Sequence, residues 1–142
     1  MSSAFENLTG PGKPLRHEPP DAREIEGLIR TAHRKLADAR HPELSAEGRF
    51  DLAYHAAHSL SLCALRWHGY RCSNRYVVFQ LLPQTLGLGP DVWRVLAKCH
   101  DIRNRSEYEG SFTADEGLLA ELMAACDTLT DRLKAMPPIP PG

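Results

Sequence analysis

The chain has 142 residues, of which 42% are hydrophobic and 25% charged, an ordinary composition for one globular domain. Its 17 basic and 18 acidic side chains nearly cancel, so net charge favours no class of partner. No apolar run approaches the roughly 18 residues that a membrane helix needs. Composition therefore excludes a disordered body and predicts no contact with a membrane.

Two features predict a cytoplasmic location. Residues 1–8 lack the basic segment and the apolar run of a signal peptide, so we expect none. The cysteines form no C-x-x-C pair, and we interpret them as reduced, small buried thiols: Cys63, Cys72, Cys99 and Cys126. We expect no metal and no other cofactor.

Proline and glycine mark both ends of the chain. Residues 1–20 contain Gly10, Pro11, Gly12, Pro14, Pro19 and Pro20, which predicts a flexible arm with no regular element. Residues 137–142 predict a proline-rich tail that ends the last helix. The intervening residues 21–136 show helical periodicity without strand alternation, and we expect one helical domain there.

Two long helices are expected first. Asp21 is a predicted N-cap with Glu24 as its capping-box partner, and Pro42 ends this first helix. A second helix begins at Ser45 and reaches about His68. Its apolar stripe is wide and rich in alanine, which predicts a central helix packed closely against more than one neighbour.

Three further helices complete the expected bundle. A short one begins at Ser73 and is interrupted by Pro83. Pro90 suits the first turn of a fourth helix. A fifth begins at the capping box formed by Thr113 and Glu116. The sequence therefore predicts an all-α bundle of five helices joined by short connections.

Charge is segregated in the second half of the chain. Residues 66–105 contain seven basic and two acidic side chains, whereas residues 106–131 contain seven acidic ones and no Lys or Arg. The simpler interpretation is two solvated faces that attract each other. The alternative is an anion site near the fourth helix, suited to RNA phosphates. The candidate RNA-binding side chains are Arg71, Arg75, Arg94, Lys98 and Arg105.

Arg103 occupies a position where the apolar stripe of the fourth helix continues. At about 100° per residue, Leu96, Cys99 and Arg103 fall within about 60° of one another. A guanidinium is always charged and is rarely buried without a partner. Arg103 therefore either reaches out of the bundle or meets an anion in a cleft, and Glu107, one turn later, is the simplest partner.

The stretch from Leu96 to Gly110, LAKCHDIRNRSEYEG, resembles the C-R-x-x-R-N-x-x-x-Y run of many bacterial HEPN proteins. The stretch from Phe79 to Gly87 also resembles that group. The family's catalytic pattern is Arg, four residues, then His, often with Asn after the Arg. Arg103 and Asn104 match its first half, whereas Tyr108 stands where the family has His. The resemblance implies a HEPN-like helical bundle over roughly residues 45–135.

The resemblance also implies an activity, which is metal-independent RNA cleavage in a toxin-antitoxin or antiviral defence system. Arg103 would stabilise the phosphate, Asn104 would orient it or brace the site, and Tyr108 would replace the histidine. The implied partners are RNA, a second copy of the chain and an antitoxin such as a nucleotidyltransferase. The two copies would meet through the side of the fourth helix that carries Trp93 and Ala97, or through the stripe of the second helix.

Other interpretations stay open beside this one. The chain is alternatively a catalytically inactive HEPN-like module that binds a partner protein or a nucleotide. The Arg-Asn-Tyr cluster is then a structural contact between subunits. His55 and His58 lie three residues apart on the second helix, but we expect surface or core histidines rather than metal ligands. Cys99 beside His100 lies on the apolar stripe, which indicates a core residue rather than a nucleophile.

Overall fold

The computed structural model describes the backbone of residues 3–109 and 116–139, and the side chains of residues 4–105 and 116–139. These residues are mainly helical, which confirms the expected all-α class in its coarse form. The elements are α1 (Ser3–Asn7), β1 (Leu15–His17), α2 (Ala22–Ala39), α3 (Ala46–Trp67), β2 (Tyr70–Cys72), α4 (Arg75–Gln80), α5 (Leu82–Thr85), α6 (Pro90–Glu109) and α7 (Glu116–Lys134).

Side-chain caps set the starts of α2 and α3. The Asp21 carboxylate accepts hydrogen bonds from the backbone N–H groups of Arg23 and Glu24, at 2.9 and 3.4 Å. The Ser45 hydroxyl oxygen accepts one from the N–H of Gly48 at 3.0 Å. Both starts confirm the predicted boundaries. The capping box at Asp21 is only half correct, because the Glu24 carboxylate binds arginines of other elements instead of reaching back.

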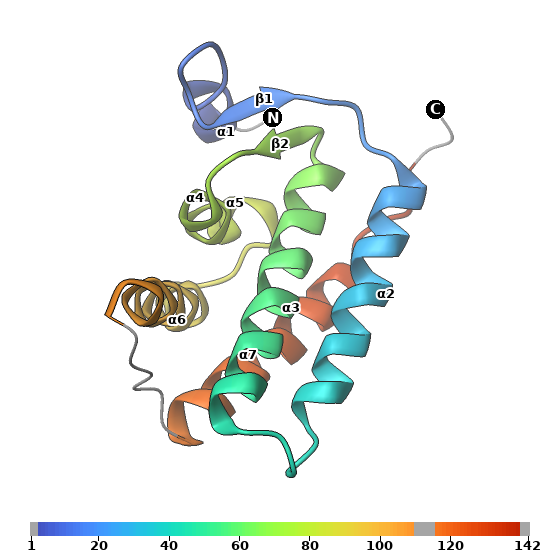
Figure 1. Ribbon diagram of the computed structural model, residues 1–142. Helices are drawn as coiled ribbons and strands as arrows, with labels where there is room; N and C mark the ends of the chain where they lie inside the picture. Colours follow the sequence, from blue (N-terminus) through green and yellow to red (C-terminus); the bar gives the residue numbers. More distant parts are fainter. Residues whose placement is uncertain (1–2, 110–115, 140–142) are drawn as a thin grey trace.

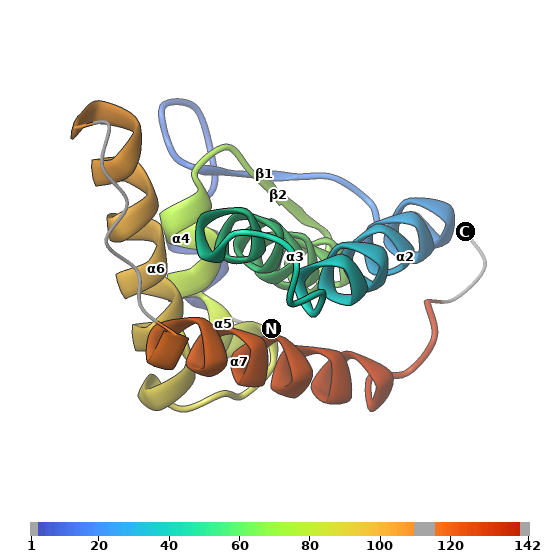
Figure 2. The ribbon, with the colours of Figure 1, turned by 60° about the horizontal axis from the view of Figure 1, so that its bottom comes forward.

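Helix α3 is the centre of the molecule, as its alanine-rich stripe predicts. Ala53, Ala56, Ala57 and Ala64 are completely buried, and small side chains let neighbouring backbones approach closely. Figure 1 shows α2 running beside α3, and Figure 2 shows α7 running along one side of these two helices. Because α2 and α7 cover the stripe within one chain, the expectation that it forms a dimer interface is wrong.

The remaining helices follow the predicted order with local differences. Helix α4 is capped by Asn74 rather than begun by Ser73, since the Asn74 side chain accepts from the N–H of Val77 at 3.1 Å. Pro83 lies in the first turn of α5, where a proline has no hydrogen bond to lose. Helix α6 begins at Pro90 as predicted and runs crosswise to α7 along one side of the bundle (Figure 2). Thr113, the predicted cap of α7, lies outside the described residues.

The N-terminal arm contains regular structure, so the expectation of an irregular arm is wrong. Strand β1 pairs antiparallel with β2, with Leu15 opposite Cys72, and α1 precedes it (Figure 1). The arm buries Phe5 and Leu15 in a small second core with Leu65, Tyr70, Val78 and Leu81. Strands of three residues are too short to show alternation, which is why the sequence gives no strand signal.

A buried arginine fastens this arm to α3. The Arg66 side chain is only 1% exposed and donates from Nε to Glu24 Oε1 at 2.7 Å. Its Nη1 and Nη2 donate to the carbonyl oxygens of Glu18 and Pro19, each at 2.8 Å. Arg71 binds the carboxylates of Glu18 and Glu24 from the other side. These ion pairs join the segment between β1 and α2 to the end of α3.

No helix in the described ranges has an apolar stretch long enough to cross a membrane.

Candidate functional site

Polar and aromatic side chains gather where α3, α4 and α6 meet, and we call them the three-helix cluster. Its members on α3 follow the i, i+3, i+4, i+7 spacing that aligns side chains on one helix face. Those on α6 follow i, i+3, i+4. The cluster consists of Asp51, Tyr54, His55 and His58 on α3, Arg75, Tyr76 and Phe79 on α4, and His100, Arg103 and Asn104 on α6.

Arg103 crosses from α6 to α3 and binds a carboxylate there. Its Nε donates to Asp51 Oδ1 at 3.0 Å, and its guanidinium carbon lies 5.3 Å from the centre of the Tyr54 ring. The side chain is 20% exposed. The guanidinium thus meets an anion, as one of the two expectations for Arg103 states, and the anion is the Asp51 carboxylate. The side chain of the expected partner, Glu107, lies outside the described residues.

His55 accepts a hydrogen bond from the same guanidinium. Arg103 Nη2 lies 3.3 Å from His55 Nε2, and because a guanidinium only donates, Nε2 must carry a lone pair. Burial lowers the pKa of His55 and Arg103 lowers it further, against the opposing effect of Asp51. The His55 imidazole is therefore neutral at neutral pH, and its basic nitrogen lies beside the Arg103 guanidinium.

A hydrogen-bonded chain holds the imidazole of His100. The Tyr54 hydroxyl lies 2.8 Å from His100 Nδ1, and Asn104 Nδ2 lies 3.1 Å from His100 Nε2. Burial lowers the pKa of His100, and the nearby Arg75 lowers it further. Burial raises the pKa of Tyr54, which is 1% exposed, so its phenol keeps its proton. Asn104 thus holds the His100 imidazole by a hydrogen bond.

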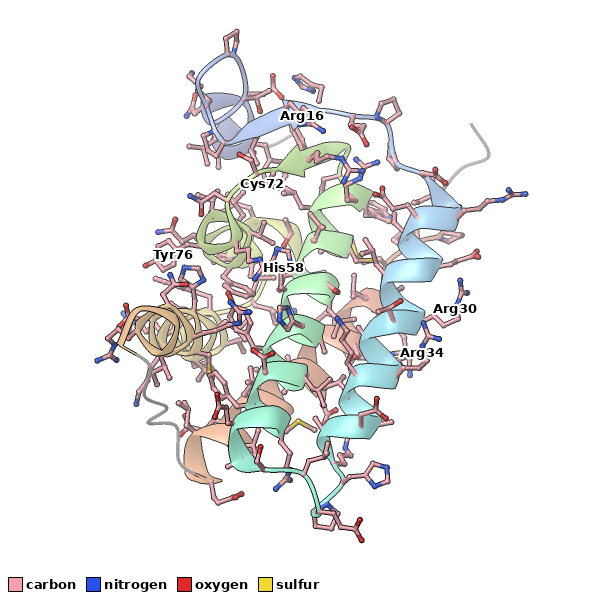
Figure 3. The ribbon with its side chains drawn as sticks, viewed as in Figure 1. Arg16, Arg30, Arg34, His58, Cys72 and Tyr76 are labelled. Atoms are coloured by element: carbon pink, nitrogen blue, oxygen red, sulfur yellow. The ribbon has the colours of Figure 1, made fainter. Side chains whose placement is uncertain are left out.

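His58 is the third neutral imidazole of the cluster. Its ring packs edge-on against Phe79, 6.1 Å between centres, and lies between α3 and α4 (Figure 3). Burial lowers its pKa to about 4, with contributions from Arg75, His55 and His100. Arg75 therefore acts electrostatically on all three histidines of the cluster.

The structure brings only some of the predicted site residues together. Arg75, Arg103 and Asn104 share the cluster, whereas Arg71 lies at the β1–β2 end in ion pairs with glutamates. Arg94, Lys98 and Arg105 fall roughly 160–220° from Arg103 around α6, on the opposite side of the helix. Tyr108 belongs to α6, but its side chain lies outside the described residues.

Sequence reasoning missed Asp51, Tyr54 and Tyr76. The signal was available as a polar stripe along the otherwise apolar α3, since Asp51, Tyr54, His55 and His58 share one face. Within the described residues, no three His, Cys, Asp or Glu side chains converge in a way that could hold a metal ion. Cys99 is fully buried and burial raises its pKa to about 12, which confirms the core interpretation of its thiol.

In comparisons with family models, with curated proteins and with solved structures, the chain matches none. The resemblance to HEPN proteins therefore depends on the two sequence stretches described above, residues 96–110 and residues 79–87.

Proposed function

We propose that the three-helix cluster binds RNA through a phosphate and cleaves the adjacent phosphodiester bond without a metal. One observation carries the proposal: Arg103 donates to His55, and the positive charge of Arg75 lowers the pKa of all three imidazoles of this partly exposed cluster. Guanidinium groups bind phosphate oxygens through paired donors, and imidazoles transfer protons near neutral pH. These are the groups that such cleavage requires.

The reaction is an internal transfer that needs no added water. The ribose 2′-hydroxyl loses its proton and its oxygen bonds to phosphorus, while the bond from phosphorus to the 5′-oxygen breaks. The products are a 2′,3′-cyclic phosphate and a 5′-hydroxyl, which takes up a proton. A base and an acid are therefore needed on the two sides of the phosphate, with positive charge to stabilise the crowded intermediate.

The histidines supply the proton transfers in this proposal. His55 Nε2 is the base, because its lone pair is released when Arg103 turns from it to a phosphate. His100 is the acid in this proposal: a bound phosphate raises the pKa of a neighbouring imidazole, and Nε2 carries the proton once the Asn104 amide nitrogen turns from it. Imidazoles of α3 and α6 then do the work of the family's histidine, whose place in the sequence is taken by Tyr108.

RNA cleavage and its loss in Arg103→Ala test the proposal. Purified protein incubated with mixed RNA and EDTA should release fragments with cyclic-phosphate ends. Removing the guanidinium should slow cleavage at least 100-fold, the effect typical of removing one charge-stabilising donor. The resemblance implies a toxin or defence ribonuclease restrained by an antitoxin. Induction of the wild-type gene should therefore arrest growth, whereas induction of the Arg103→Ala gene should not.

The matched control is Arg30→Ala, which removes an exposed arginine of α2 far from the cluster (Figure 3). It should cleave like wild type, and both variants should melt within a few degrees of wild type. Cleavage that persists in Arg103→Ala would remove this residue from the mechanism. RNA binding without cleavage by the wild type would instead favour the inactive binding module.

Asp51 acts as an internal competitor for the phosphate in this proposal. Its carboxylate, 51% exposed, occupies the guanidinium that the phosphate must reach. Asp51→Asn keeps the shape and removes the charge, so we expect it to tighten RNA binding several-fold at low salt. Fluorescence anisotropy with a labelled, non-cleavable RNA measures the change. The control is Asp38→Asn, which removes one negative charge at an exposed position on α2. If both variants tighten RNA binding equally, the effect comes from net charge and Asp51 is not a competitor for the phosphate.

A further inference from the structure

Tyr76 places an accessible aromatic ring at the edge of the three-helix cluster. It is 36% exposed, whereas the other aromatic carbocycles of the cluster, Tyr54 and Phe79, are 1% and 0% exposed. In the described part of the chain, only Leu44 is another large hydrophobic side chain exposed to this degree. Of these three aromatic side chains, Tyr76 is thus the one whose ring a ligand can reach.

The Tyr76 ring lies near the groups that bind the phosphate in the proposed function. The Tyr76 ring centre lies 5.5 Å from that of His100, tilted by 46°, on the side of α4 that faces α6 (Figure 3). Arg75 precedes it in the same helix turn, and His100 is bonded to Asn104, the neighbour of Arg103. The Tyr76 ring therefore lies against the His100 imidazole, and the charges of Arg75 and Arg103 act on the same imidazole.

This combination fits a nucleotide better than a free anion. A nucleotide presents a flat base and a charged phosphate joined by one sugar, and proteins that bind single strands combine aromatic rings with basic groups. A base in a duplex is already stacked and paired, so it cannot lie on a protein ring unless it is released.

We propose that Tyr76 stacks on a base of single-stranded RNA while Arg75 and Arg103 bind a phosphate of the same strand. This inference rests on the proposed function and specifies its substrate as unpaired RNA. It makes Tyr76 a positioning residue, which holds the nucleotide but takes no part in proton transfer.

The test measures binding of a labelled oligoribonucleotide whose 2′-hydroxyls are methylated, so that it cannot be cleaved. At one fixed salt concentration, Tyr76→Ala should weaken binding roughly tenfold and Tyr76→Phe should bind like wild type, since stacking needs the ring alone. Leu44→Ala removes the other large hydrophobic side chain that is exposed among the described residues, and it should change nothing. Circular dichroism and melting temperature confirm that each variant is folded.

A second perturbation identifies the stacked base. An abasic spacer moved along the strand should weaken wild-type binding at one position, and that position should have no effect in Tyr76→Ala. A duplex of the same sequence should bind more weakly than the single strand.

The outcomes separate this inference from the proposed function. A wild-type protein that binds neither strand form overturns both. Single-strand binding that Tyr76→Ala leaves unchanged overturns the stacking inference alone, as does equal affinity for the duplex.

Discussion

Arg66→Ala is expected to lower the free energy of unfolding by about 3–5 kcal/mol, the loss typical of removing one partner of a buried ion pair. The substitution leaves Glu24 Oε1 and the carbonyl oxygens of Glu18 and Pro19 without the donors of Arg66, although Arg71 still binds Glu24 Oε2. It also empties the volume of a large side chain that is 1% exposed. Urea unfolding followed by circular dichroism measures the change.

Two variants show whether burial is the cause. Arg71→Ala removes an arginine that binds the same two carboxylates but is 26% exposed, so its loss should be nearer the surface value of about 1 kcal/mol or less. Arg66→Lys keeps the charge without the planar fork and should recover only part of the stability. If the free energy of unfolding of Arg66→Ala lies within about 1 kcal/mol of the wild-type value, the network has no structural role.

Stability is expected to fall as pH drops below neutral, and His58 should make a large contribution. Its pKa is 6.5 in an unfolded chain and about 4 in the folded protein. The unfolded chain therefore binds the proton first, and stability is lost progressively between these two values. The full effect is on the order of 3 kcal/mol, at about 1.4 kcal/mol for each pKa unit. The lowered pKa values of His55 and His100 act in the same direction.

The readout is the slope of stability against pH, so a change in absolute stability does not obscure it. His58→Gln cannot take up the proton and should flatten the slope between pH 6.5 and about 4. His33→Gln, an exposed histidine of α2, should leave the slope as it is. A His58→Gln slope equal to that of wild type would show that folding does not lower the pKa of His58.

The glutamates around Arg66 add a second loss at lower pH. A hydrogen bond from Arg71 lowers the pKa of Glu18, and for Glu24 bonds from Arg71 and Arg66 outweigh the opposing effect of burial. A carboxyl group with a lowered pKa stabilises the fold at pH values above its unfolded value of 4.5, and this stabilisation is lost as the pH falls below 4.5. Glu24→Gln should weaken this acid phase and leave the His58 phase in place.

Helix boundaries could be predicted because their causes are local. Asp21, Ser45 and Pro90 each act on a backbone within a few residues, so sequence spacing is enough to identify them. The strand pair could not be predicted, because Leu15 finds its partner at Cys72 and neither strand exceeds three residues. The same separation hides the role of Glu24, whose partners are arginines far along the chain.

The candidate site, too, could be predicted from the sequence only in part. The misfit of Arg103 on an apolar stripe is visible in one helix, and it correctly indicates a partner from elsewhere. The identity of that partner depends on how α6 lies against α3, which brings Asp51 to Arg103 and Tyr54 to His100. A polar stripe on α3 was readable, but only the position of α4 and α6 shows which side chains it meets.

The pairing of β1 with β2 has a consequence for synthesis on the ribosome. Residues 5–15 are made before the residues that cover them, so Phe5 and Leu15 have no surface to pack on until the chain as far as Tyr70, Val78 and Leu81 has been made. The nascent protein therefore exposes hydrophobic side chains of the arm until then, and closing this long loop is a late event. A bulky fusion at the amino terminus should hinder that closure more than one at the carboxyl terminus.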